Sequence, residues 1–173
     1  RSLVGSEMCI RDRCEAERLG LAQRQAADLA TQIQALAAPR FAPLTQICGI
    51  SLLPAAALAG ILGPGQRFTS DAQLAAYAGV APLGASSAGR VRHRLNRGGN
   101  RRLNAILYRI AVTQARCSPQ AQAYLSRRAG EGETRREALR ALQRFIVRPI
   151  WRRWQECAAL VRDATPECAP LAA

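Results

Sequence analysis

The sequence contains no lysine, and its single histidine is His93. All 25 basic residues are therefore arginine, and with 12 acidic residues they give a net charge of +13. Because lysine occurs nowhere, arginine has not been selected over lysine at any particular site. The placement of the positive charge is consequently more informative than the identity of the cation.

The patterns that mark metal-binding and disulfide-rich proteins are also missing. The six cysteines form no C-x-x-C pair and no short cluster with His93; they stand at positions 9, 14, 48, 117, 157 and 168. Zinc sites need such ligands at close spacing, so we predict neither a zinc site nor a disulfide framework. No apolar run approaches the roughly 18 residues of a membrane-spanning helix, and no secretory signal is present. These absences predict no membrane contact and a reducing, cytoplasmic setting.

Acidic residues are missing from one long stretch of the chain. Between Pro82 and Arg128 there are ten arginines and no aspartate or glutamate. Positive charge concentrated on this scale favours binding to a polyanion, with an affinity that depends strongly on salt. The alternative is a solvated basic face that serves solubility, although such faces usually mix charges of both signs.

The first 13 residues, RSLVGSEMCIRDR, match one translated frame of a common transposon-based sequencing adapter. We interpret residues 1–13 as a library artefact and exclude them from the fold prediction. On this interpretation the authentic reading frame begins near Cys14, inside a longer gene, and the natural protein has further residues at its N-terminus.

Residues 14–40 are predicted to form a linker helix of coiled-coil type. Its apolar residues alternate spacings of three and four, as in the seam of a heptad pattern; they are Leu19, Ala22, Ala26, Leu29, Ile33 and Leu36. Pro39 is expected to end the helix. The pattern fits a coiled coil with another chain and, equally, an amphipathic helix packed on its own domain.

Residues 44–63, LTQICGISLLPAAALAGILG, predict a helix-hairpin-helix-like element with a tight turn at residues 48–51. Backbone N–H groups at the start of such a second helix can bind a phosphate without sequence preference. The usual hairpin has two glycines, whereas here Gly49 is followed by Ser51 in the second place. A purely structural helical hairpin is therefore an alternative.

Four further helices are predicted on either side of a basic loop. The first is capped by Thr69 or Ser70 and stops at Gly79, and the loop at residues 80–89 then runs into RVRHRL, which can be extended. A helix follows from Asn100, and its apolar residues form one face: Leu103, Ile106, Leu107, Ile110 and Ala111. Its arginines at positions 102, 109 and 116 recur every seven residues, so they lie along one side.

The last two helices complete a mainly α domain that covers residues 41–160. One runs from Pro119 to Gly130, and the other begins at Thr134, which forms a capping box with Glu137. A kink or stop is expected near Pro149. The tail at residues 161–173 is predicted to be disordered.

Four blocks of sequence follow one another in a distinctive order. They are LTQICGISLLPAAALAGILG, RFTSDAQLAAYAGVAP, SSAGRVRHRLNRGGNRRLNAILYRIA and QAYLSRRAGEGETRREALRALQRFI, and they cover roughly residues 41–150. In this order they resemble the C-terminal domain of transposases of the insertion sequence 110/116/902 family. The motifs F-x-S-x-x-x-L-A-A-Y-A-G-x-A-P and R-G-G-N-R-x-L-N are specific in combination. The helix before them is similar to the end of the segment that links this domain to the family's upstream catalytic domain.

This resemblance implies a DNA recombinase that excises and inserts its element under the guidance of an element-encoded structured RNA. It implies an upstream resolvase-like domain whose four acids bind magnesium, and a serine in this domain that attacks DNA within a motif ending Ser-Gly. The matching residues here are Ser86-Ser87-Ala88-Gly89, in which Ser87 is the better candidate nucleophile by position and Ser86 the next. Ala88 stands where the family usually has glycine, which leaves the choice of serine open.

We therefore predict the DNA-binding part of a transposase, separated from its metal-binding acids. No acid cluster that could hold a metal is present, so we expect no cofactor in this chain, magnesium in the missing N-terminal domain, and no recombination by the chain alone. The expected partners are DNA and the structured RNA, with a homo-oligomer in the full-length protein. The residues expected to contact nucleic acid are Arg90, Arg92, His93, Arg94, Arg97, Asn100, Arg101, Arg102 and Arg109, together with Gly49 and Ser51 of the hairpin.

Two other classes of function fit the same residues. One is a non-catalytic helix-hairpin-helix module in which Ser86 and Ser87 are inert. The other is a helical interaction protein whose basic face binds an acidic protein. The target sequence and the way in which the RNA is bound cannot be read from these residues, because arginines that contact phosphates carry no base information.

Overall fold

The computed structural model describes residues 3–63, 67–84, 93–94, 96 and 98–164. Within these residues the chain is helical apart from one short ladder of two strands, so the predicted mainly α fold is confirmed. In chain order the elements are α1 (Leu3–Phe41), the 3-10 helix η1 (Ala42–Gln46), α2 (Leu52–Leu62), α3 (Asp71–Tyr77), β1 (Leu83–Gly84), β2 (His93–Arg94), α4 (Arg101–Cys117), α5 (Pro119–Gly130) and α6 (Arg135–Ala164).

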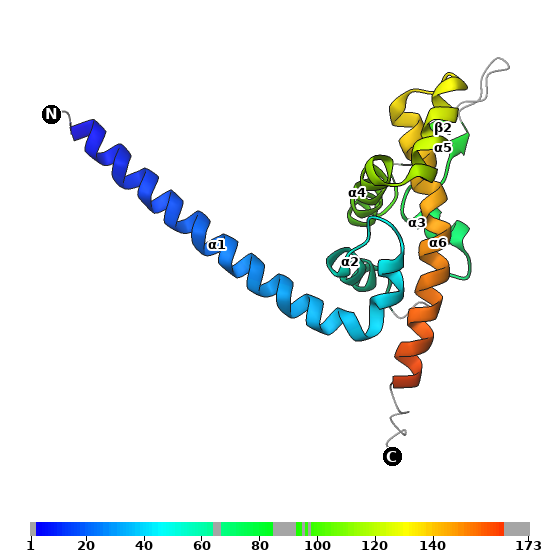
Figure 1. Ribbon diagram of the computed structural model, residues 1–173, viewed down its shortest axis with the longest axis horizontal. Coiled ribbons are helices and arrows are strands. Elements are labelled where there is room, and N and C mark those ends of the chain that lie inside the picture. The colour runs from blue at the N-terminus through cyan, green and yellow to red at the C-terminus, as the bar shows by residue number, and fades with distance from the viewer. Residues whose placement is uncertain (1–2, 64–66, 85–92, 95, 97, 165–173) are drawn as a thin grey trace.

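The core lies where α4 packs on α6, with α2, α3 and α5 around them (Figure 1). Its fully buried side chains are mostly leucine and isoleucine: Leu58 and Leu62 in α2, Leu103, Leu107 and Ile110 in α4, and Leu142, Ile146 and Ile150 in α6. Burial of each such side chain contributes about 1.5–3 kcal/mol. These contacts fix which face of each helix remains exposed.

The helix α1 extends away from this body as a long arm (Figure 1). Only its last turns join the core, where Ala37 is buried and the ring of Phe41 stacks on Trp154 with 5.7 Å between ring centroids. The leucines and the isoleucine of the predicted heptad seam have exposed fractions between 40% and 76%. The seam is therefore not packed on the chain's own domain.

Two prolines that were predicted to interrupt helices lie inside them instead. Pro39 lies within α1, which continues to Phe41, and Pro149 lies within α6. A proline in a helix removes one hydrogen bond and costs about 3 kcal/mol. Around Pro149 the buried side chains of Val147 and Ile150 offset this cost. The first helix thus ends two residues later than predicted from Pro39, and a stop at Pro149 is wrong, while a kink there stays a prediction. The helix α6 continues beyond Val161 to Ala164, and residues 165–173 of the predicted tail lie outside the described residues.

The helix caps follow the sequence closely. Of the two candidates before α3, Ser70 is the cap, and its hydroxyl accepts a hydrogen bond from the backbone N–H of Gln73. The predicted capping box is also present: Glu137 accepts hydrogen bonds from the backbone N–H of Thr134 at 2.9 Å and from its hydroxyl at 2.7 Å. Caps of this kind satisfy N–H groups that have no partner within the helix.

Candidate nucleic-acid interface

The exposed face of α4 carries the row of arginines that the sequence predicts. Arg102, Arg109 and Arg116 are all exposed, and we call these three residues the α4 arginine row. Successive members differ by about 20° around the helix axis because each residue advances about 100°. Within the described part of the chain, no member of the row forms an ion pair with an acidic side chain, and neither does the adjacent Arg101.

The direction of the α4 arginine row is set by the opposite face of the helix. That face is apolar and buried, as predicted, and consists of Leu103, Ile106, Leu107, Ile110 and Ala111. The start of the helix is fixed by Asn100, whose side-chain oxygen accepts a hydrogen bond from the backbone N–H of Leu103 at 3.0 Å. Since the apolar face packs on α6, the row must face outward.

The start of α4 is also bound to the end of α3. The backbone N–H of Asn100 donates to the carbonyl oxygen of Tyr77 at 2.7 Å, and its side-chain amide donates to the Tyr77 hydroxyl at 2.8 Å. Four residues later the amide of Asn104 donates to the carbonyl oxygen of Ala78 at 3.0 Å. Asn100, which we predicted to contact nucleic acid, therefore has its side chain engaged in the fold.

Two glycines allow this close approach of α3 and α4. Gly79 has φ +71°, and a Cβ atom there would lie 2.9 Å from the carbonyl oxygen of Asn96. A Cβ atom on Gly99 would collide with the backbone of Gly79. The segments A-Y-A-G and G-G-N belong to the two specific sequence motifs and lie about twenty residues apart in the chain. They meet in one junction, which a residue larger than glycine at position 79 or 99 would disrupt.

The segment that carries the candidate nucleophiles lies, in the sequence, between the two glycines of this junction. The strands β1 and β2 pair in antiparallel register, with Leu83 opposite Arg94 and Gly84 opposite His93. This ladder places both ends of the intervening segment side by side. Several predicted site residues lie outside the described residues: Ser86, Ser87, Arg90, Arg92 and Arg97. Of His93 and Arg94 the structure describes the backbone ladder only.

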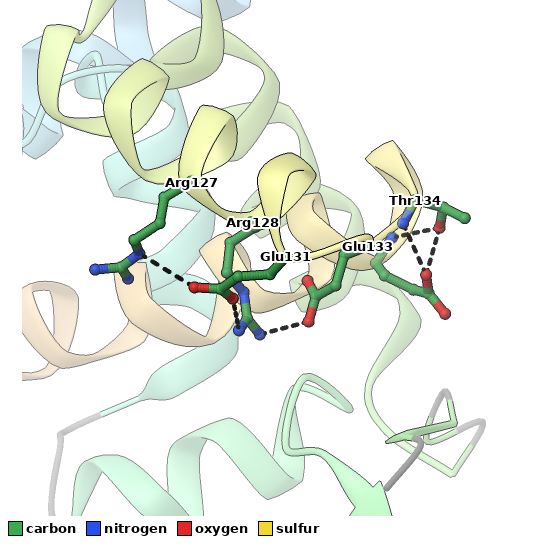
Figure 2. A network of polar contacts seen from close by, with 6 residues as sticks. Arg127, Arg128, Glu131, Glu133 and Thr134 are labelled. Atoms are coloured by element: carbon green, nitrogen blue, oxygen red, sulfur yellow. Dashed lines mark hydrogen bonds and ion pairs between the residues drawn. The ribbon is translucent and has the colours of Figure 1, made fainter. Parts of the chain in front are cut away.

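Two arginines of the acid-free stretch are paired with carboxylates, so fewer of its positive charges are unpaired than the sequence predicts. Figure 2 shows Arg127 and Arg128 at the end of α5 paired with carboxylates that lie just beyond the acid-free stretch. Arg128 is 3.0 Å from a carboxylate oxygen of Glu131 and 2.8 Å from one of Glu133, and Arg127 is 3.7 Å from Glu131. The hydrogen bond to Glu131 raises the pKa of Arg128, against the opposing effect of burial. The basic stretch includes these two arginines, and their ion pairs reduce the positive charge that it offers to a partner.

The predicted hairpin has a packing role beside α4. Its first element is the short 3-10 helix η1, and its second is α2, which begins after Ser51 without a side-chain cap. Gly49 has φ +86°, and a Cβ atom there would lie 3.3 Å from the carbonyl oxygen of Ile110. The amide of Gln114 also donates to the carbonyl oxygen of Cys48 at 2.8 Å. The turn therefore packs on α4, while phosphate binding by Gly49 and Ser51 stays a prediction.

The sequence did not predict a cavity that lies beside the first two turns of α4, next to the junction with α3. Its volume is about 450 Å³, and the described residues that line it include Asn96, Arg101, Asn104 and Tyr108. Tyr108 is 50% exposed on α4 and lies about 20° around the helix axis from Arg101. The sequence signal was this aromatic residue, seven positions after Arg101 on a polar helix face.

No metal centre is formed by the described residues. They contain no group of three or more His, Cys, Asp or Glu side chains that could hold a metal ion. Asp71 is paired with Arg144 at 3.3 Å and Arg148 at 3.5 Å. Burial raises the pKa of the Cys157 thiol, which keeps this core side chain protonated and unreactive.

Within the same described residues, no helix has both the length and the apolar character needed to cross a membrane.

Comparison with known proteins gives two matches. A family model described as "Transposase IS116/IS110/IS902 family" matches residues 42–126. The chain is also similar to the "Insertion element IS110 uncharacterized 43.6 kDa protein" of Streptomyces coelicolor, with 34% identity over 146 residues. This similarity covers 83% of the chain and 34% of that protein, so the chain spans about a third of the relative's length.

Proposed function

Because the chain belongs to the IS116/IS110/IS902 family of transposases through its domain at residues 42–126, we propose that this domain binds nucleic acid during transposition. The α4 arginine row contacts the sugar–phosphate backbone. Arg101 and the arginines among residues 90–97 are proposed as further contacts to the same backbone. DNA is the first partner, and the family's structured RNA is the second.

The observation that carries this proposal is that no acidic side chain among the described residues forms an ion pair with the α4 arginine row. Its three members span about 21 Å of helix, at 1.5 Å per residue. Duplex DNA carries about one negative charge per 1.7 Å of its axis, so several phosphates fall within the length of the row. Arginines that are already paired with carboxylates would have to break those ion pairs before they could bind a phosphate.

We propose further that Ser87, or Ser86 next to it, is the nucleophile for strand transfer. In this step the hydroxyl loses its proton, a bond forms from its oxygen to phosphorus, and a bond from phosphorus to a sugar oxygen breaks. A serine hydroxyl needs a base or metal for the first event and cations for the charge that gathers on the phosphoryl oxygens. The proposed cations are four arginines that follow the serines closely in sequence: Arg90, Arg92, Arg94 and Arg97.

Magnesium, on this proposal, would be held by the acids of the upstream N-terminal domain that the family resemblance implies, where it would activate the hydroxyl. The chain by itself then binds nucleic acid and does not recombine it. A homo-oligomer of the full-length protein is also proposed, with the exposed seam of α1 as the contact. Incubation of the purified chain with supercoiled plasmid and magnesium is expected to leave the plasmid uncut.

The test of nucleic-acid binding is an anisotropy titration of the whole chain with labelled duplex DNA and with a structured RNA. We expect the logarithm of the binding constant to fall linearly with the logarithm of salt concentration, with a slope of about −3 or steeper. Absence of binding at low salt to every oligonucleotide would contradict the proposal. Salt-insensitive binding to an acidic protein would instead favour the interaction protein.

The role of the serines needs a separate test, because binding does not depend on it. In a full-length family member, alanine substitution of both corresponding serines should abolish strand cleavage while DNA binding persists. Transposition that survives this double substitution would favour the non-catalytic helix-hairpin-helix module. A covalent adduct between protein and DNA, mapped to one serine by mass spectrometry, would choose between the two candidates.

A further inference from the structure

We propose that the cavity beside Tyr108 accepts one unpaired nucleobase of the nucleic acid that the α4 arginine row binds. The inference rests on the proposed nucleic-acid function and adds to it a site for a base. Such a site would select strands with an unpaired nucleotide, such as a bulge, a loop or a single-stranded end, over a continuous duplex.

The ring of Tyr108 is the first observation that supports this site. The rings of Tyr77 and Tyr124 are both used inside the fold: they pack against Phe68 and Phe145, with ring centroids 5.2 and 5.9 Å apart. Within the described residues Tyr108 has no such ring contact and no guanidinium over its face. A half-exposed ring at the edge of a cavity offers a surface on which a base can stack.

Two amide side chains supply the polar groups that a base edge requires. The side-chain nitrogen of Asn104 donates to the carbonyl oxygen of Ala78, which leaves its oxygen as an acceptor. The side-chain oxygen of Asn96 accepts from the backbone N–H of Gly98 at 3.0 Å, which leaves its nitrogen as a donor. The wall of the cavity thus contains one acceptor and one donor held by the fold, and a nucleobase edge presents groups of both kinds.

The cavity lies where the backbone of a bound strand would pass. Around the axis of α4, Tyr108 lies about 20° from Arg101 and about 80–120° from the members of the α4 arginine row. A strand whose phosphates bind the row can therefore turn one base toward the Tyr108 side. The volume of about 450 Å³ falls within the range of about 300–1,000 Å³ that is usual for sites of small organic groups.

The test compares a duplex that contains one bulged 2-aminopurine with the same duplex fully paired, in a DNA series and an RNA series. For Tyr108→Ala we expect about 5- to 150-fold weaker binding of the bulged duplex, since stacking on an aromatic ring accounts for that range. Binding of the paired duplex should change less than about twofold. Tyr108→Phe keeps the ring and should behave like the unmodified chain. The 2-aminopurine fluorescence should be quenched on binding to the unmodified chain and recover on Tyr108→Ala.

Phe145→Ala is the control for loss of an aromatic ring elsewhere: Phe145 is 66% exposed on α6, and its ring packs on Tyr124 of α5 rather than lining the cavity. It should leave both duplexes bound as before. Equal loss of bulged and paired duplex on Tyr108→Ala, or no loss of either, would overturn the base site while the nucleic-acid function stands. If the unmodified chain binds no oligonucleotide, the proposed function itself fails. The series with the larger Tyr108 effect identifies whether the base comes from DNA or RNA.

Discussion

The arginines of α4 and those at the end of α5 come from the same acid-free stretch of sequence, yet the structure gives them different surroundings. Arg102 and Arg109 are exposed on α4 and form no ion pair within the described residues. Arg127 and Arg128 lie against Glu131, and Arg128 also against Glu133 (Figure 2). Two pairs of equal formal charge therefore differ in what they can offer to a phosphate.

The cause of the difference is local. Glu131 follows Arg127 and Arg128 by four and three residues, which is the spacing that brings side chains together on one helical turn. On α4 the residues at the same spacing from Arg102 and Arg109 are not acidic. The charge that a stretch offers to a partner thus depends on the acids within one turn of each arginine, including acids beyond the ends of the stretch.

The largest effect on DNA binding should come from neutralising the two arginines of α4, with the two arginines at the end of α5 as the comparison. Arg102→Gln with Arg109→Gln is expected to weaken duplex binding about a hundredfold at about 50 mM salt and to reduce the magnitude of the salt slope by about two, because two phosphate contacts are lost. Arg127→Gln with Arg128→Gln is the matched control and should weaken binding less than about threefold. Anisotropy titrations measure both. Equal losses in the two double variants would show that ion pairing does not separate the regions.

The second prediction concerns an acid introduced into α4, three or four residues from its arginines, which is the spacing of Glu131 from Arg128 and Arg127. Ala105 is exposed and lies four residues after Arg101, three after Arg102 and four before Arg109. Ala105→Glu should therefore pair with these arginines and weaken duplex binding about tenfold relative to the neutral Ala105→Gln. The free energy of unfolding should rise by a few tenths of a kcal/mol per pair. If both variants bind alike, the α4 arginines do not contact phosphates.

The third prediction removes the acids from the other region. Glu131→Gln with Glu133→Gln should free Arg127 and Arg128 and strengthen duplex binding about three- to fivefold at low salt. The control is Glu15→Gln with Glu156→Gln, which removes the same amount of negative charge from two other ion-paired carboxylates. The control also frees two arginines, Arg18 and Arg153, so an equal gain in both double variants would assign the effect to charge in general rather than to Arg127 and Arg128.

Much of the fold could be predicted because its signals are local. Helix starts were identified from a cap and its partner three residues on, as at Thr134 and Glu137, and the exposed side of α4 from the spacing of its apolar residues. Both signals depend on one or two turns of helix, so no tertiary information is needed.

The features that were missed depend on contacts between distant segments. Pro39 and Pro149 are tolerated because neighbouring side chains pack in the core, and this cannot be read from the proline itself. The contact of Gly79 with Gly99 and the hydrogen bond from Asn104 to Ala78 join segments about twenty or more residues apart. The cavity beside Tyr108 is a product of that junction, so the sequence alone offered only an unexplained aromatic residue.

The smallest effect concerns a third arginine pair, Arg144 and Arg148 of α6, which holds an acid of another helix. Desolvation favours the neutral form of Asp71, but the hydrogen bonds and charges of Arg144 and Arg148 outweigh it and lower the pKa of the carboxyl. The contribution of this group to stability is therefore complete above the ordinary pKa of aspartate and is lost as the pH falls through the lowered value. Urea unfolding should show Asp71→Asn to be slightly less stable than the unmodified chain near neutral pH, with a difference that shrinks in strong acid and in high salt. A difference that stays constant across this pH range would mean that the negative charge of Asp71, and with it the pairing with the two arginines, does not contribute to stability.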